Sequence, residues 1–153
     1  MGILSQVENV LTVKELDMFA AHITNSPKND FQNFRLIIDY ESIKNRVKLL
    51  IEKEFATTVL EYKYLGMEYN TFTVGEKQDV HIDFTKRDDK PDYSSIVYWV
   101  NDFDGGEIYF PEDEIEIKPK AGSLIYWANP MLHGVKEVKS GNRYATSFFW
   151  VKN

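Results

Sequence analysis

Two of the three histidines in the chain stand where metal-ligand chemistry is available. The stretch DVHIDF places His81 two residues before Asp83. Residues i and i+2 of a β-strand project from the same face, so we expect these two side chains to point the same way. The opposite face would carry Val80, Ile82 and Phe84, which we expect to anchor the strand in the core. Taken alone, the motif is more typical of a hydrogen-bonded surface histidine followed by a turn-forming acid.

Two further residues with chemical potential follow in the last quarter of the chain. His133 comes after the apolar stretch SLIYWA and a short loop, and Arg143 opens RYATSFFW ten residues later. In a strand, Arg143 and Ser147 share a face, with Ala145 between them. An arginine on an otherwise apolar face is costly unless an anion meets it. The alternative is a surface strand in which the arginine points to solvent.

The four residues together predict an iron site. The chain has no cysteine, so any metal must be bound by nitrogen and oxygen. Two histidines and one carboxylate can occupy one triangular face of an octahedron, which is the arrangement of non-haem Fe(II) oxygenases, and three positions stay open. A bidentate 2-oxo acid fills two of them and dioxygen the third. The guanidinium of Arg143 suits the far carboxylate of 2-oxoglutarate.

With these motifs, the sequence resembles the 2-oxoglutarate/Fe(II)-dependent dioxygenases, most closely their prolyl 4-hydroxylase-like branch. The resemblance covers about residues 58–151. FTVGEKQDVHID keeps the aromatic residue and the glycine that precede the His-x-Asp pair in that branch. WVNDFDGGEIYFPE resembles the strand, Gly-Gly turn and second strand of the family, and IKPKAGSLIYWAN the approach to the distal histidine. HGVKEVKSGNRYATSFFW resembles the stretch from that histidine to the co-substrate arginine.

The resemblance implies a set of site residues and cofactors. His81, Asp83 and His133 would be the metal ligands and the catalytic residues, and Arg143, Ser147 and Trp99 would bind the co-substrate. The implied cofactors are Fe(II), 2-oxoglutarate and dioxygen, with ascorbate as an optional reductant.

Several residues depart from the family pattern. Phe72 stands where a tyrosine is frequent, and it has no hydroxyl to offer the co-substrate. A tyrosine is also common at Trp99, so support for Arg143 comes from the Trp99 N–H, from Tyr98 or from neither. Gln78 replaces another frequent aromatic residue. These differences leave the cofactors intact and the substrate open.

The resemblance implies hydroxylation of an unactivated C–H bond, with succinate and CO2 as co-products. The substrate we expect is a prolyl residue of a peptide or protein; a free amino acid or another small molecule is the alternative. Asp83 favours hydroxylation, because related halogenases lack this carboxylate. Nucleic-acid dealkylases of the superfamily carry a second arginine where Phe149 stands, and the net charge of −6 also argues against nucleic acid. A cupin-like module that binds metal or ligand without turnover is the non-enzyme alternative.

The pattern along the chain predicts a mainly β fold with N-terminal helices. The length of 153 residues suits one domain, which we expect to divide into helical support (1–57) and a catalytic core (58–153). Apolar residues at helical spacing, with a capping-box pattern at Thr12 and Glu15, predict helices over 12–23 and 41–55. From residue 58 onward, short segments rich in β-branched and aromatic residues predict a double-stranded β-helix, that is, a cupin-like jelly roll with the helices packed on the major sheet.

Other segments have simpler expected roles. The charged loop 85–94 is expected to be solvated, with a lid over the substrate as the alternative. His22 is expected to be a packing or surface histidine, and Trp127, Trp150, Phe148, Tyr62 and Tyr64 are expected to be core or edge aromatics. No apolar run reaches the roughly 20 residues that span a bilayer, and no signal-peptide pattern is present, so a cytoplasmic location without membrane contact is expected.

Overall fold

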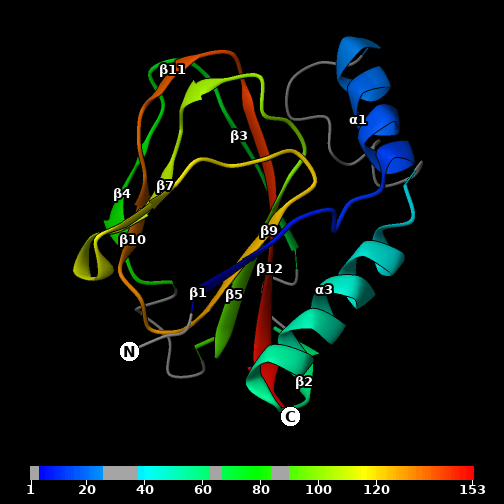
Figure 1. The fold of residues 1–153 in the computed structure, drawn as a ribbon, viewed down its shortest axis with the longest axis vertical. Helices are drawn as coiled ribbons and strands as arrows, with labels where there is room; N and C mark the ends of the chain where they lie inside the picture. Colours follow the sequence, from blue (N-terminus) through cyan, green and yellow to red (C-terminus); the bar gives the residue numbers. More distant parts are fainter. Residues whose placement is uncertain (1–3, 26–37, 63–66, 84–89) are drawn as a thin grey trace.

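The computed structural model describes residues 4–25, 38–62, 67–83 and 90–153, which form two main β-sheets and a small two-stranded one, with two helices against one of the main sheets (Figure 1). The helices are α1 (Val13–Asn25) and α3 (Tyr40–Phe55), and the 3-10 turn η1 spans Pro111–Asp113. The strands, in chain order, are β1 (Leu4–Val7), β2 (Val59–Glu61), β3 (Met67–Phe72), β4 (Gln78–His81), β5 (Tyr93–Tyr98), β6 (Asp104–Gly105), β7 (Ile108–Phe110), β8 (Ile115–Ile117), β9 (Leu124–Ala128), β10 (His133–Val135), β11 (Val138–Ser140) and β12 (Arg143–Lys152).

The two main sheets are antiparallel and lie face to face. The major sheet has the order β1-β9-β5-β12-β2, with β3 also paired to β12, and the minor sheet has the order β4-β10-β7-β8. A separate two-stranded sheet joins β11 and β6. Figure 1 shows β4, β7 and β10 on one side of the major sheet and the helices on the other. The predicted class, a jelly roll with helices packed on the major sheet, is confirmed.

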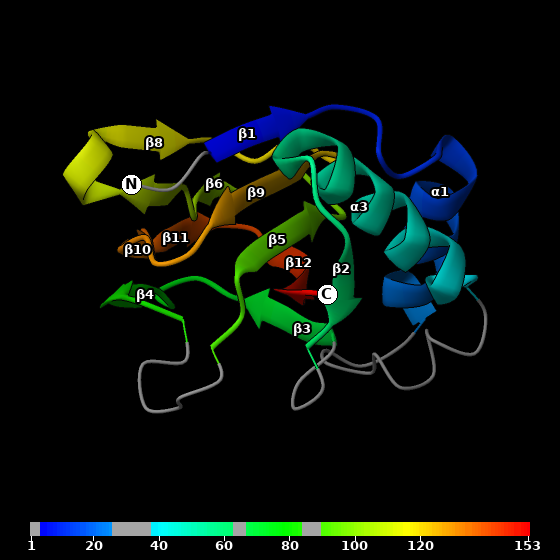
Figure 2. The same cartoon turned by 90° about the horizontal axis from the view of Figure 1, so that it is seen from below.

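The helices bury their apolar stripes on the outer face of the major sheet, and Figure 2 shows α3 lying along it. Ile43, Val47 and Ile51 of α3 recur every four residues and are all buried in one cluster with side chains of β5, β9 and β12. Phe19 of α1 stacks on Trp99, with their ring centroids 4.9 Å apart. This packing fixes the major sheet from behind and leaves its inner face available for the site.

A second apolar cluster fills part of the space between the two sheets. It combines Ile96 and Ile125 of the major sheet with Ile108 and Phe110 of the minor sheet. Burial of such side chains contributes about 1.5–3 kcal/mol each and holds the two sheets at a fixed separation. A cavity also lies between the two sheets.

The predicted capping box at the start of α1 is confirmed, and it also carries an ion pair. The Thr12 amide donates to the Glu15 carboxylate at 2.8 Å, and the Glu15 amide donates to the Thr12 hydroxyl at 3.1 Å. The guanidinium of Arg46, on α3, binds both oxygens of Glu15 at 2.8 and 2.6 Å. The same guanidinium donates to the Val10 carbonyl, so one side chain ties α3 to the start of α1.

The N-terminal third is not purely helical. The sequence-based prediction missed β1, which pairs with β9 at the edge of the major sheet, because a four-residue strand is too short to show a clear alternation.

The division into 1–57 and 58–153 within one domain stays a prediction. No helix in the described part of the chain is both long and apolar enough to cross a bilayer, and the cytoplasmic location stays a prediction.

The expected core anchors behind the His-x-Asp motif need correction. Val80 is 41% exposed, because β4 is the edge strand of the minor sheet and no other described sheet or helix packs on its outer face. Ile82 is half-buried, and Phe84 lies outside the described residues, as do Tyr64 and residues 85–89 of the charged loop. The end of that loop is not solvated: Tyr93 and Ser94 are buried members of β5.

We expect Glu15→Gln to lower the free energy of unfolding by about 1–2 kcal/mol at neutral pH, because the charged half of the Arg46 pair is lost. Burial acts to raise the pKa of the Glu15 carboxyl, but hydrogen bonds from Arg46 and Thr12 hold it below its ordinary value. A group with a lowered folded-state pKa stabilises the fold above its unfolded pKa and loses that effect as the pH falls through the folded pKa.

The difference between wild type and Glu15→Gln should therefore shrink on acidification below about pH 4.5. Urea unfolding at a series of pH values measures it. Glu116→Gln is the matched control, since its pair with Lys136 is half-exposed on both sides and should matter far less. A Glu15→Gln difference that stays constant with pH would contradict the expectation.

Candidate metal centre and anion pocket

The two histidines lie directly opposite each other on adjacent strands of the minor sheet. His81 ends β4, His133 begins β10, and they are Cα partners in the antiparallel register. Directly opposed side chains on one face of a sheet are neighbours, and the two ring centroids are 4.4 Å apart. Strand pairing thus brings together two histidines that lie far apart in the sequence.

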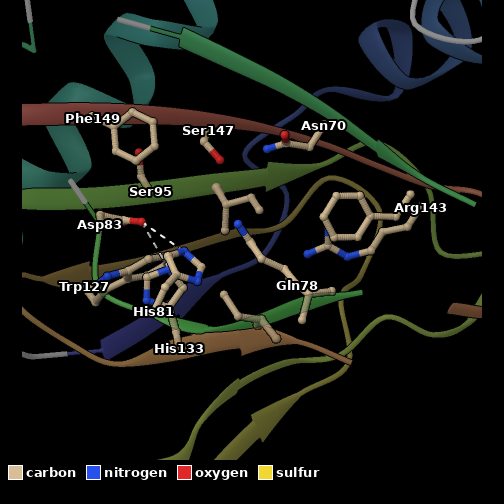
Figure 3. Close-up of a pocket in the computed structure, with 14 residues that line it drawn as sticks. Asn70, Gln78, His81, Asp83, Ser95, Trp127, His133, Arg143, Ser147 and Phe149 are labelled. Carbon is tan, nitrogen blue, oxygen red and sulfur yellow. Dashed lines mark ion pairs between the residues drawn. The ribbon is translucent and has the colours of Figure 1, made fainter. Parts of the chain in front are cut away.

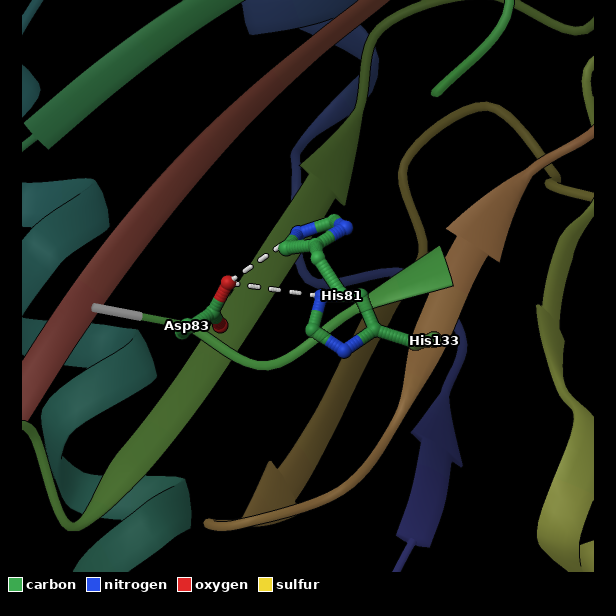
Figure 4. A group of neighbouring side chains, drawn as sticks. All are labelled: His81, Asp83 and His133. Carbon is green, nitrogen blue, oxygen red and sulfur yellow. Dashed lines mark ion pairs between the residues drawn. The ribbon is translucent and has the colours of Figure 1, made fainter. Parts of the chain in front are cut away.

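Asp83 reaches the same point by a different route from the one that strand alternation predicts. β4 ends at His81, and Asp83 lies in a turn beyond it. One carboxylate oxygen, Oδ1, still lies 3.4 Å from Nε2 of His81 and 3.4 Å from Nε2 of His133. Figure 4 shows the three side chains pointing toward one another. Their ligand atoms all lie within 4.8 Å of each other, so the structure brings the three predicted ligands together.

On each histidine ring, the hydrogen bond of Nδ1, which faces away from Asp83, determines which nitrogen carries the proton. Nδ1 of His81 lies 2.9 Å from the Asp79 carbonyl, and Nδ1 of His133 lies 2.8 Å from the Met131 carbonyl. A carbonyl oxygen can only accept, so each ring carries its proton on Nδ1 and presents a lone pair on Nε2 when neutral. Two lone pairs and a carboxylate oxygen then converge on one point. One proton cannot serve all three, whereas a metal cation can.

The carboxylate of Asp83 is held in its ionised form. Burial acts to raise its pKa, but hydrogen bonds from His133 and His81 in their protonated, metal-free form, together with the hydrogen bond from Ser94, outweigh burial and keep the pKa well below its usual range. An ionised carboxylate with two neutral imidazoles is the donor set that suits Fe(II), and the residues present therefore fit that metal.

Arg143 lies elsewhere in the same cavity as a buried cation. It begins β12 and is 1% exposed. Its Nε donates to the Gly106 carbonyl at 3.0 Å, and its Nη2 lies 3.4 Å from the Tyr98 hydroxyl. The rings of Phe72 and Tyr98 each lie 5.2 Å from the guanidinium carbon. Within the described residues no carboxylate lies at ion-pair distance from it, so its charge is left for an anion.

The backbone at Gly106 leaves little room beside this arginine. Gly106 has φ +67°, and a Cβ there would lie 2.9 Å from Cδ of Arg143 and 3.0 Å from the Phe103 ring. The Gly-Gly turn read from the sequence thus has a physical reason. It lets the backbone carbonyl approach the guanidinium closely enough to accept from Nε.

One cavity between the sheets joins the two features. Figure 3 shows His81, Asp83 and His133 near one end and Arg143 near the other. Ser147 lines the same cavity, as its predicted parity with Arg143 requires. Asn70, Gln78 and Trp127 also line it. Sequence reasoning did not assign Asn70, and it took Trp127 for simple packing although the indole lies 4.8 Å from the His133 ring.

Trp99 does not belong to this cavity, and its expected role is corrected. Its indole N–H donates to the Thr146 hydroxyl at 2.9 Å, and its ring packs under α1 on the far side of the major sheet. Tyr98, its neighbour, faces Arg143 instead. Burial raises the pKa of the Tyr98 hydroxyl, although Arg143 opposes that shift, so the group is a neutral hydrogen-bonding partner at neutral pH.

Comparison with known proteins agrees with this geometry. The family model described as the 2OG-Fe(II) oxygenase superfamily matches residues 67–151, more than half of the chain. The chain belongs to this superfamily. The predicted superfamily is thereby confirmed. A PKHD-type hydroxylase of Pseudomonas paraeruginosa is 33% identical over 110 residues, which cover 65% of this chain and 48% of the relative. The chain thus spans about half the length of the curated relatives it matches.

Solved structures share the fold over almost the whole chain. A viral collagen prolyl hydroxylase from Paramecium Bursaria Chlorella virus-1 superposes with a TM-score of 0.72 at 18% identity, covering 96% of this chain and 94% of that one. A Pseudomonas putida prolyl-4-hydroxylase gives 0.70 at 16% identity, covering 98% and 88%. HygX from Streptomyces hygroscopicus, with nickel and 2-oxoglutarate bound, gives 0.69 at 12% identity, covering 97% and 81%.

We expect Gly106→Ala to weaken the binding of 2-oxoglutarate about tenfold or more, because the added methyl displaces the side chain of Arg143. Placing alanine at a positive φ also costs about 1–2 kcal/mol of stability. Gly75→Ala is the matched control, since Gly75 has φ +90° and nothing within 4 Å of the added Cβ. Calorimetric titration of the metal-loaded proteins should show lost affinity only for Gly106→Ala. Equal affinity losses in both variants would contradict the steric argument.

Proposed function

We propose that the protein is an Fe(II)- and 2-oxoglutarate-dependent dioxygenase that hydroxylates an unactivated C–H bond, with His81, Asp83 and His133 holding the metal and Arg143 holding the co-substrate. The observation that carries the proposal is the pairing, in one cavity, of three converging electron-pair donors with a buried arginine that has no acidic partner among the described residues. The first feature selects a cation and the second an anion. A 2-oxo acid that chelates the metal and extends to the arginine satisfies both.

The three ligands define what the protein contributes at the metal. In the metal-loaded protein these three residues would hold the ion, and the adjoining cavity would be open to the co-substrate and dioxygen. Bound Fe(II) supplies the oxidising chemistry, in which 2-oxoglutarate, dioxygen and the substrate C–H give succinate, CO2 and an alcohol. The hydrogen bonds on both Nδ1 atoms keep the histidine rings oriented throughout, and the buried Asp83 stays ionised.

Arg143 and its neighbours account for selection of a dicarboxylic co-substrate. The rings of Phe72 and Tyr98 lie against the buried guanidinium, and an apolar surrounding of this kind strengthens its attraction for a carboxylate. The Tyr98 hydroxyl supplies a second hydrogen-bonding group that Phe72 lacks. Ser147 and Asn70 line the cavity and offer further polar contacts to the same ligand.

For the substrate, we infer a prolyl residue of a peptide or protein. Support comes from the fold shared with the viral collagen prolyl hydroxylase and the Pseudomonas putida prolyl-4-hydroxylase. A free amino acid or another small molecule is the alternative. A cupin-like module without turnover would bind metal and anion but form no succinate.

We expect Arg143→Gln to raise the KM for 2-oxoglutarate by about 100-fold, since a charge-assisted bidentate contact contributes roughly 3 kcal/mol. Arg143→Lys should raise it less, about tenfold, because a point charge is kept but the planar fork is lost. Succinate formation at varied 2-oxoglutarate measures both. Arg46→Lys is the control, because that arginine lies on α3 and pairs with Glu15. An unchanged KM in Arg143→Gln would contradict the assignment.

We expect proline-containing peptides to stimulate succinate formation at least about tenfold over the uncoupled rate, and free amino acids to stimulate it far less. Mass spectrometry should find one added oxygen on the prolyl residue. His81→Ala should abolish the stimulated rate. Stimulation by free amino acids alone would favour the small-molecule alternative. A wild-type protein that binds Fe(II) and 2-oxoglutarate yet never forms succinate would favour the binding module.

A further inference from the structure

The second oxygen of the Asp83 carboxylate is occupied by a buried serine of the opposite sheet. Oδ1 faces the two histidines, whereas Oδ2 accepts a hydrogen bond of 2.6 Å from the Ser94 hydroxyl. Ser94 is fully buried in β5, on the major sheet. Because Asp83 lies beyond the end of β4, strand pairing does not fix its side chain. The contact with Ser94 is therefore a distinct restraint on the carboxylate.

The hydrogen bonds behind Ser94 have a defined direction. The Asn129 side-chain amide nitrogen donates to the Ser94 hydroxyl at 2.8 Å and to the Pro91 carbonyl at 3.2 Å. The Asn129 side-chain oxygen accepts from the Trp127 indole N–H at 3.1 Å. An indole only donates and a carbonyl only accepts, so this orientation of the amide is the one that satisfies all its partners. The Ser94 hydroxyl accepts a hydrogen bond from Asn129, so it donates its single proton to Asp83.

The chain of donors begins and ends at the metal ligands. Trp127, at its start, packs against the His133 ring with centroids 4.8 Å apart, and Ser94, at its end, binds Asp83. The backbone N–H of Asn129 also donates to the Asp92 carbonyl at 2.9 Å, which ties the end of β9 to the start of β5. Trp127 and Ser94 are buried and Asn129 is half-buried, and each bond polarises the next toward the carboxylate.

We infer that Trp127, Asn129 and Ser94 form a positioning relay that fixes Asp83 as a one-oxygen ligand. The relay caps Oδ2 and leaves Oδ1 as the donor to the metal, so the carboxylate does not take a second coordination position that the co-substrate or dioxygen needs. The inference rests on the proposed metal centre. These are positioning residues, because none of them supplies a metal-ligand atom.

Mn(II) binding, followed by the electron paramagnetic resonance of the free ion, tests the relay without turnover. Ser94→Ala should bind Mn(II) about 10–100-fold more weakly than wild type, as is usual when a partner of a ligand is removed. Asn129→Ala should also weaken binding, because the Ser94 hydroxyl is then free to rotate. The double variant should be no weaker than Ser94→Ala alone, since Asn129 acts through Ser94.

Ser123→Ala is the matched control. Ser123 is 1% exposed and its hydroxyl donates to the Lys120 carbonyl, so the variant loses a buried hydroxyl that is not part of the relay. It should bind Mn(II) as wild type does. Urea unfolding of each variant shows whether weaker Mn(II) binding comes from an unfolded protein or from a displaced Asp83 carboxylate in a folded one. If Ser94→Ala proves unstable, the Mn(II) affinity of Asn129→Ala tests the same relay.

Two outcomes would overturn the relay: wild-type Mn(II) affinity in folded Ser94→Ala, or a double variant whose loss is the product of the two single losses. A different result would overturn the metal centre itself. In that case the wild type would not bind Mn(II), or His81→Ala and His133→Ala would bind it as tightly as wild type does.

Discussion

Three electron-pair donors that converge on one point repel one another, and much of the surrounding structure serves to hold them there. The antiparallel register places His81 opposite His133, and two backbone carbonyls fix the tautomer of both rings. Asp83 is ionised although it is buried, which is costly without the hydrogen bonds that surround it. The fold thus stores an electrostatic cost at this point, and a cation relieves it.

The two sheets divide the work between them. The minor sheet contributes the histidines, and the major sheet contributes Arg143 and Ser147 from β12. β12 pairs with β5 on one edge and with β2 and β3 on the other, so it is the most firmly bonded strand of the sheet. The helices pack on its other face through Phe148 and Trp150. An arginine at the start of such a strand has little freedom, which suits a group that must meet a ligand without reorganisation.

The sequence predicts the parts of the site in which residue type determines the chemistry. It predicts less well the parts in which tertiary packing determines the direction of a side chain. The types and spacing of four residues predicted that they gather at one site, and the structure places all four around one cavity: His81, Asp83, His133 and Arg143. The alternation of side chains along the strand could not decide whether Tyr98 or Trp99 points into the cavity. Both faces of β5 are buried, so the sequence pattern does not distinguish the face toward the cavity from the face toward the helices. The same limit hid Ser94, whose partner Asp83 lies in the turn after β4, and it misplaced Val80, which lies on the edge strand of the minor sheet.

The unpaired charge of Arg143 links the stability of the folded protein to its supply of co-substrate. A guanidinium that is buried without a carboxylate partner among the described residues makes the ligand-free fold less stable than its apolar contacts alone would give. A bound dicarboxylate removes that deficit and adds about 2.7 kcal/mol when its concentration is 100 times its Kd. In a cell, the lifetime of such a protein against proteolysis would then follow the level of any dicarboxylate that binds at Arg143.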